Sequence, residues 1–100
     1  MNASQLFKYL TDNFKVLDSM SNEIIQIETK DFYFGDEYSN ECGDEYIIYF
    51  SDKTAYRVTK TYYNEIDDNG YNDGYSNHSV REYYEDNNCT ADEIFNKIQL

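Results

Sequence analysis

The first hydrophobic pattern in the chain has helical spacing. Over residues 4–20 apolar side chains recur three or four positions apart, and charged residues take the opposite face. The apolar set comprises Leu6, Phe7, Leu10, Phe14, Leu17 and Met20. The pattern predicts an amphipathic helix over residues 4–20, with Ser4 as its N-cap and an end at residues 19–22.

The pattern then changes to the alternation of a β-strand. Residues 23–30 alternate between apolar and polar side chains. We expect Ile25, Ile27 and Thr29 to share one face of this strand, while the polar residues between them face water. Residues 31–34 either extend the strand or begin the next one.

A β-hairpin occupies the middle of the chain. Residues 46–50 and 55–66 are rich in Tyr, Ile, Val and Thr, and the polar break at 51–54 has the length of a hairpin loop. Neither face of the second arm is cleanly apolar, so the pattern does not predict which side is buried. Residues 35–44 and 67–77 are dense in acids and turn formers, which predicts two loops between strands.

The chain ends with a strand and a helix. Residues 80–85 predict a short strand that pairs with the long arm of the hairpin. Thr90 and Glu93 match a capping box, ahead of a short helix with Ile94 and Ile98 on its apolar side. The element order predicts one α+β domain over residues 1–100, an antiparallel sheet of about four strands with an N-terminal and a short C-terminal helix on one face.

The charge balance is strongly acidic. Twenty acids against eight bases give a net charge of −12 and a pI near 4.2. Such a chain repels nucleic acid and anionic lipid and is attracted to basic surfaces. Phe and Tyr make up 18% of the residues, whereas disordered acidic chains are poor in aromatics, so we expect a folded protein.

The sequence also favours a cytoplasmic protein. No apolar run approaches the roughly 20 residues that span a bilayer, and the N-terminus has no pattern of a secretory signal. The two cysteines, Cys42 and Cys89, are expected to be reduced thiols in that compartment.

Catalytic and metal-binding signatures are absent from the sequence. His78 is the only histidine, which leaves no multi-histidine zinc site, and neither cysteine has a nucleophile signature around it. The four glycines are too sparse for a phosphate-binding loop. With Gly70 at the sixth position of an EF-hand loop, Ser76 stands where a bidentate carboxylate is required. We therefore expect a non-enzymatic protein without a cofactor or metal.

The acids gather in two segments of the sequence. Residues 31–52 hold seven acids and no base, and residues 65–93 hold nine acids and one base, Arg81. A sheet face or loop lined with such carboxylates matches the charge pattern that a Lys- and Arg-rich nucleic-acid groove binds. Tyrosines between the acids supply amphipathic anchors and stack on guanidinium planes.

In composition and architecture the whole chain resembles the small acidic anti-CRISPR proteins of phages and mobile elements. The shared features are small size, acidity, tyrosine richness, a composition typical of AT-rich genes and the helix–sheet–helix plan, and no motif is shared. The resemblance implies an inhibitor that occupies the DNA-binding groove of the Cas9–guide RNA complex. Its acids would mimic DNA and compete with the PAM duplex for the arginine-containing site that reads it.

The residues expected to contact such a partner follow from the acidic loops rather than from the resemblance. They are Asp36, Glu37, Asp44 and Glu45 in the first loop, Asp67, Asp68 and Asp73 in the second, and Tyr38, Tyr71 and Tyr75 as anchors. Three alternatives stay open. They are an immunity or antitoxin-type protein that neutralises a toxin nuclease, a small adaptor or calcium-binding module that uses residues 67–74, and an acidic domain whose charges only keep it dispersed.

Overall fold

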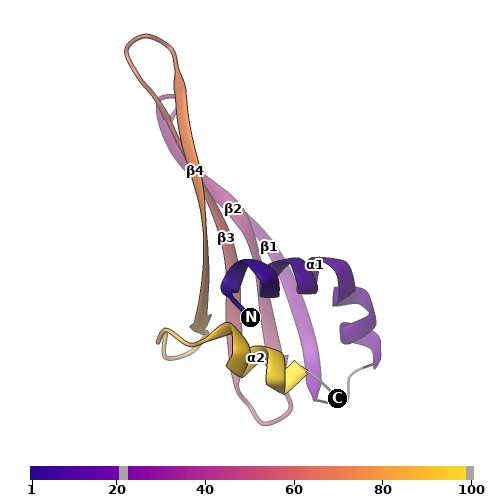
Figure 1. Ribbon diagram of the computed structural model, residues 1–100. Coiled ribbons are helices and arrows are strands. Elements are labelled where there is room, and N and C mark those ends of the chain that lie inside the picture. Colours follow the sequence, from indigo (N-terminus) through magenta and orange to yellow (C-terminus); the bar gives the residue numbers. More distant parts are fainter. Residues whose placement is uncertain (21–22, 99–100) are drawn as a thin grey trace.

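In a computed structural model of the protein, two helices pack on one face of a four-stranded antiparallel sheet (Figure 1). The structure describes residues 1–20 and 23–98. The elements in chain order are α1 (Ala3–Met20), β1 (Ile24–Gly35), β2 (Ser39–Phe50), β3 (Ala55–Ile66), β4 (Asn72–Glu82) and α2 (Ala91–Ile98). The strands lie in the sheet in the order β1-β2-β3-β4, so each pairs with its neighbour in sequence. The predicted α+β fold is confirmed.

The strands are much longer than the part of the sheet that the helices cover. A strand of 12 residues spans about 40 Å, and the molecule measures 52 × 27 × 21 Å. Figure 1 shows α1 and α2 across the end of the sheet that holds the β2–β3 turn, while the other end projects beyond them. We call this projecting part, residues 31–44 and 61–77, the distal arm, and the sheet face that neither helix covers the open face.

The hydrophobic core lies between the helices and the covered half of the sheet. Its most deeply buried side chains come from four elements, and each is at most 1% exposed: Leu6, Leu10, Ile48, Val58, Ile94 and Ile98. The core also orients the central strands, because Tyr46, Ile48 and Phe50 of β2 all face the helices. The hydroxyl of Tyr46 donates to Thr11 Oγ1 at 3.0 Å, which satisfies its polar end at the edge of the core.

Both helices begin with side-chain caps. The α1 cap is Asn2 rather than the predicted Ser4: Gln5 N donates to Asn2 Oδ1 at 2.9 Å, and Asn2 N donates to Gln5 Oε1 at 2.8 Å. This reciprocal pair is a capping box that begins two residues earlier than expected. At α2, the prediction of Thr90 as N-cap is confirmed, because Glu93 N donates to Thr90 Oγ1 at 3.2 Å. Part of the predicted α1 end, residues 21–22, and the side chain of Met20 lie outside the described residues.

A β-bulge near the start of β1 overturns the predicted facing of its isoleucines. The register with β2 shifts between Ile24 and Gln26. The extra residue rotates the strand, so Ile24 and Ile27 are buried while Ile25 is 66% exposed. Residues 31–34 continue β1.

The two predicted loops are mostly strand. In the first predicted loop, residues 35–44, strand β2 begins at Ser39. In the second, residues 67–77, strand β4 begins at Asn72. The predicted strand over residues 80–85 is the last part of β4 and the turn after it. These polar segments form strands because they complete the backbone ladders with β1 and β3, which local propensity does not report.

Gly43 marks the base of the distal arm in β2. A Cβ at this position would collide with the carbonyl oxygen of Lys60 and would lie 2.9 Å from the Phe32 ring. Phe32 stands directly opposite Gly43 in the register, so its ring covers the space that a side chain would otherwise fill. Only glycine fits at this point of the sheet.

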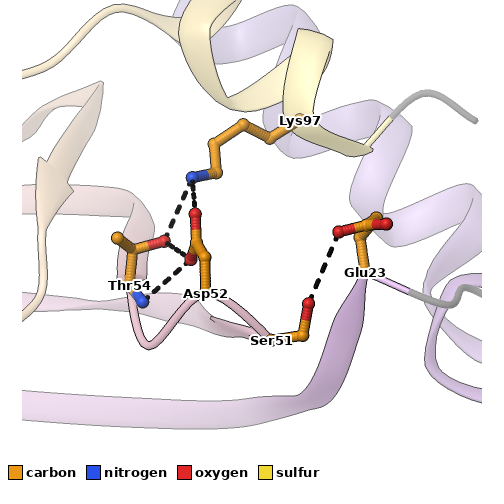
Figure 2. A network of polar contacts seen from close by, with 5 residues as sticks. All are labelled: Glu23, Ser51, Asp52, Thr54 and Lys97. Carbon is orange, nitrogen blue, oxygen red and sulfur yellow. Dashed lines mark hydrogen bonds and ion pairs between the residues drawn. The ribbon is translucent and has the colours of Figure 1, made fainter.

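A polar network fastens α2 to the β2–β3 turn (Figure 2). Lys97 Nζ donates to Asp52 Oδ2 at 2.6 Å and to Thr54 Oγ1 at 3.1 Å, and Thr54 N donates to Asp52 Oδ1 at 3.0 Å. Beside it, Ser51 Oγ donates to Glu23 Oε2 at 3.4 Å, which joins the same turn to the start of β1. The hydrogen bond from Lys97, followed by those from Thr54, lowers the pKa of Asp52 to about 2.

The β1 bulge predicts opposite outcomes for two neighbouring isoleucines. Ile27→Ala removes a buried side chain and should lower the free energy of unfolding by about 2–5 kcal/mol. Ile25→Ala, the matched control, should change it by no more than ~0.5 kcal/mol. Urea unfolding of both variants makes the comparison, and equal losses would mean that the strand has no bulge.

The Lys97–Asp52 pair predicts a loss of stability in acid. Because the folded-state pKa of Asp52 lies below its ordinary value of 3.8, the pair stabilises the fold above that pH and is lost as the pH falls through about 2. Asp52→Asn should therefore lower the Tm at pH 6 but not at pH 2, relative to the unmodified protein. Asp12→Asn, on the exposed side of α1, controls for the loss of one negative charge.

Candidate functional site

The distal arm concentrates the negative charge of the protein. It holds nine of the twenty acids and no Lys, Arg or His. The nine are Asp31, Asp36, Glu37, Glu41, Asp44, Glu65, Asp67, Asp68 and Asp73. Because no helix packs on the arm, these side chains stand on a part of the sheet that water reaches from both faces (Figure 1).

Hydrogen bonding brings the two predicted acidic loops together at the tip of the arm. Ile66 N, at the end of β3, donates to Tyr38 O in the β1–β2 turn at 2.7 Å. The tip thus gathers residues of both turns that were predicted as partner contacts: Asp36, Glu37, Tyr38, Asp67, Asp68 and Tyr71. Their proximity follows from the strand register and was not visible in the sequence.

Two of these acids also build the turns that carry them. Asp36 Oδ1 accepts from Tyr38 N and Ser39 N, both at 2.9 Å, and the N–H groups of Ser39 and then Tyr38 lower the pKa of Asp36. Asp67 Oδ1 accepts from Asn69 N at 3.0 Å and from Tyr71 N at 2.9 Å. Such Asx turns hold each carboxylate in a fixed position, and both residues are exposed.

Glu45 has an internal role rather than a free carboxylate. Its Oε1 lies 2.9 Å from Arg57 Nε in an ion pair and accepts from Thr59 Oγ1 at 3.0 Å, and its side chain is only 14% exposed. Its neighbour Asp44 lies on the opposite face, between Asp31 and Lys60 in the strand register. Of these two predicted partner contacts, only Asp44 is exposed to solvent.

The remaining two predicted residues, Asp73 and Tyr75, lie on the open face of β4. There Tyr75 completes a cross-strand row with Phe34, Glu41 and Tyr63, each directly opposite the next. The rings of Tyr63 and Tyr75 are stacked, with centroids 4.8 Å apart and planes at 23°. These side chains line an open groove of about 420 Å³ on the arm.

Sequence reasoning missed Phe34, Glu41, Tyr63 and Glu65 as members of this surface. Alternation would have identified them, because side chains two residues apart share a face of a strand. That signal is hidden because the turn-forming composition of residues 35–44 predicts a loop, which breaks the alternation between β1 and β2. The register of the long hairpins is what places the four residues together.

Within the described residues none of the arm's acids forms an ion pair, although Asp44 stands directly opposite Lys60 in the strand register. The ion pairs there join Lys30 to Glu28, Arg57 to Glu45, Arg81 to Asp86, Lys97 to Asp52 and the N-terminus to Asp92. On the arm, by contrast, Glu65 stands directly opposite Asp73, and Asp31 opposite Asp44. Like charges in such positions repel and destabilise a sheet.

Aromatic side chains are exposed among these acids. Five of them are between 60% and 73% exposed: Tyr33, Phe34, Tyr38, Tyr71 and Tyr75. Large aromatic groups in water lose apolar hydration when a partner covers them, and Tyr retains a hydroxyl for hydrogen bonding. The arm therefore combines unpaired charge with exposed apolar area, as protein-binding surfaces do.

The other candidate chemistry has structural surroundings. His78 packs edge-on against Phe7, with centroids 5.7 Å apart, and burial, followed by the charge of Lys60, lowers its pKa. Both cysteines are free, and burial raises the pKa of Cys89 to about 11, so that it stays a thiol near neutral pH. Within residues 1–20 and 23–98, no three His, Cys, Asp or Glu side chains converge as metal ligands would.

Neither helix that the structure describes is long and apolar enough to cross a membrane. Comparison of the chain with known protein families, with curated proteins and with solved structures gives no match. The distal arm is thus the feature from which a function can be argued.

The repulsion within the arm predicts that neutralising it stabilises the fold. Asp73→Asn removes the charge opposite Glu65 and should raise the free energy of unfolding by about 0.2–1 kcal/mol. Glu45→Gln, which also removes one negative charge, should lower it, because it breaks the ion pair with Arg57. Urea unfolding at low ionic strength compares the two. Equal changes would mean that only net charge matters.

Proposed function

We propose that this protein is a non-enzymatic inhibitor that binds the basic nucleic-acid-binding groove of a bacterial defence nuclease. The favoured target is the Cas9–guide RNA complex, and the arm would block target DNA by occupying its place in the cytoplasm of the host cell. The observation that carries the proposal is the distal arm itself, with nine acids, no base and five exposed aromatic side chains.

The distribution of the arm's charges supports mimicry of a nucleic-acid backbone. No two acids stand two residues apart on one strand of the arm, so its charges are contributed by different strands and by the turns. Asp36, Glu37 and Asp68 at the turns and Glu41, Glu65 and Asp73 on the strands spread the negative charge over the tip and the open face. A groove that evolved to bind phosphates would be steered toward this surface.

The lack of internal ion pairs also supports binding. A surface whose acids are already paired gains little from a basic partner, because its existing contacts must break first. The arm instead keeps repulsive pairs such as Glu65–Asp73, and a cationic partner would relieve that repulsion as it binds. The same surface would serve an immunity protein that covers a toxin nuclease, so the experiment must separate the two targets.

The test is an order-of-addition cleavage assay with purified Cas9–guide RNA complex. We expect inhibition when the protein is added before target DNA and little when it is added afterwards, because both compete for one groove. Equal inhibition in both orders would overturn DNA competition. No inhibition of Cas9, with inhibition of a toxin nuclease in a parallel assay, would replace the proposed target.

A matched pair of charge-reversal variants tests the surface. Glu37, Asp68 and Asp73→Lys on the arm should weaken inhibition roughly tenfold or more, since close charge pairs at interfaces are strongly coupled. The control variant replaces Asp12, Glu85 and Glu93 with Lys, because these three residues are exposed and lie outside the arm. Both triple variants bring the net charge from −12 to −6. Similar losses in both would show that net charge, not the arm, drives binding.

A further inference from the structure

The open groove on the distal arm has a chemistry of its own. It runs over β2, with Phe34 of β1 on one side, Tyr63 of β3 on the other and Glu41 between them. Glu65 and Asp73 line it toward the tip of the arm. Its volume of about 420 Å³ falls within the roughly 300–1,000 Å³ typical of small-ligand sites.

We propose that this groove receives an arginine side chain of the protein partner. The guanidinium would stack on the ring of Tyr63, which Tyr75 backs from behind in a parallel stack. Its N–H groups would reach the carboxylates of Glu41 and Glu65. The proposal rests on the proposed function for the nature of the partner, and it names the group that the arm recognises.

Planarity is the reason for arginine rather than another cation. A guanidinium is flat, stacks on aromatic faces and presents its N–H groups in a fork that matches a carboxylate, whereas an ammonium is a compact point charge. Phe34 and Tyr63 provide flat apolar sides, and acids lie at the floor and at one end. A small hydrated metal ion would not make use of those rings.

The molecule itself does not supply this cation. The only two arginines, Arg57 and Arg81, lie at the other end of the open face and pair with Glu45 and Asp86. Glu65 and Asp73 stand opposite each other without an ion pair in the described structure. An arriving guanidinium would therefore meet carboxylates that repel each other, and its binding would remove that repulsion.

Two short peptides test the inference without any nuclease. A glycine-spaced tri-arginine peptide and its tri-lysine counterpart carry the same charge, so only side-chain shape differs. Titration of isotope-labelled protein, followed by NMR, gives the two dissociation constants and the residues that shift. We expect arginine to bind about two- to fivefold more tightly than lysine at this exposed site, with shifts at Tyr63 and Tyr75.

Matched tyrosine variants separate stacking from general attraction. Tyr63→Leu with Tyr75→Leu should abolish the preference for arginine and retain charge-driven binding. Tyr38→Leu with Tyr71→Leu, at the tip, should retain the preference. If the first pair disturbs folding, single variants of the exposed Tyr75 replace it. Tyr75→Leu removes the ring and should reduce the preference for arginine. Tyr75→Phe keeps the ring and should retain the preference.

The outcomes distinguish this inference from the proposed function. Equal binding of the two peptides, or a preference that survives the loss of both groove tyrosines, would overturn the arginine site. The Cas9 assay would still stand or fall separately, because charge alone suffices for competition with DNA. A preference for arginine that depends on Tyr63 and Tyr75 would support the site whichever nuclease is the target.

Discussion

The burial of two helices against one half of one sheet face is the interaction on which the structure depends. Leu6 and Leu10 of α1 and Ile94 and Ile98 of α2 close over Ile48 and Val58, and each of these six side chains is at most 1% exposed. The 12-residue strands extend far beyond this core. The arm is therefore held by backbone ladders and turns that are continuous with a well-packed base.

Charge is divided between the two ends of the molecule. The base contains the ion pairs of Arg57, Arg81 and Lys97. The arm contains acids without such pairs and directly opposed carboxylates. Natural proteins accept local instability of this kind at functional surfaces, where a partner supplies the missing interactions.

Several features of the fold could be predicted from residues with strong local signals. Helical spacing indicated both helices, Thr90 indicated the α2 cap, and the Tyr- and Ile-rich segments around residues 51–54 indicated the central hairpin. Asn2 was missed because Ser4 is an equally good N-cap by type, and the β1 bulge was missed because alternation alone predicts a regular strand.

The arrangement of the site was harder to predict because its strands are polar on both faces. Residues 39–44 and 72–77 have the composition of loops, and they are strands only because neighbouring strands extend alongside them. Burial does not distinguish their faces, so the pairing of Tyr63 with Tyr75 needed the register. The internal partner of Glu45 likewise depends on Arg57, 12 residues away across the hairpin.

The separation of core from arm has a consequence for how this protein evolves. None of the side chains that form the hydrophobic core lies between residues 31 and 44 or between 61 and 77. Apart from the turn-forming aspartates and glycines, mutations in these segments leave the packing that determines folding untouched. Substitutions on the arm can therefore change the surface that it presents without requiring a new sequence for the core.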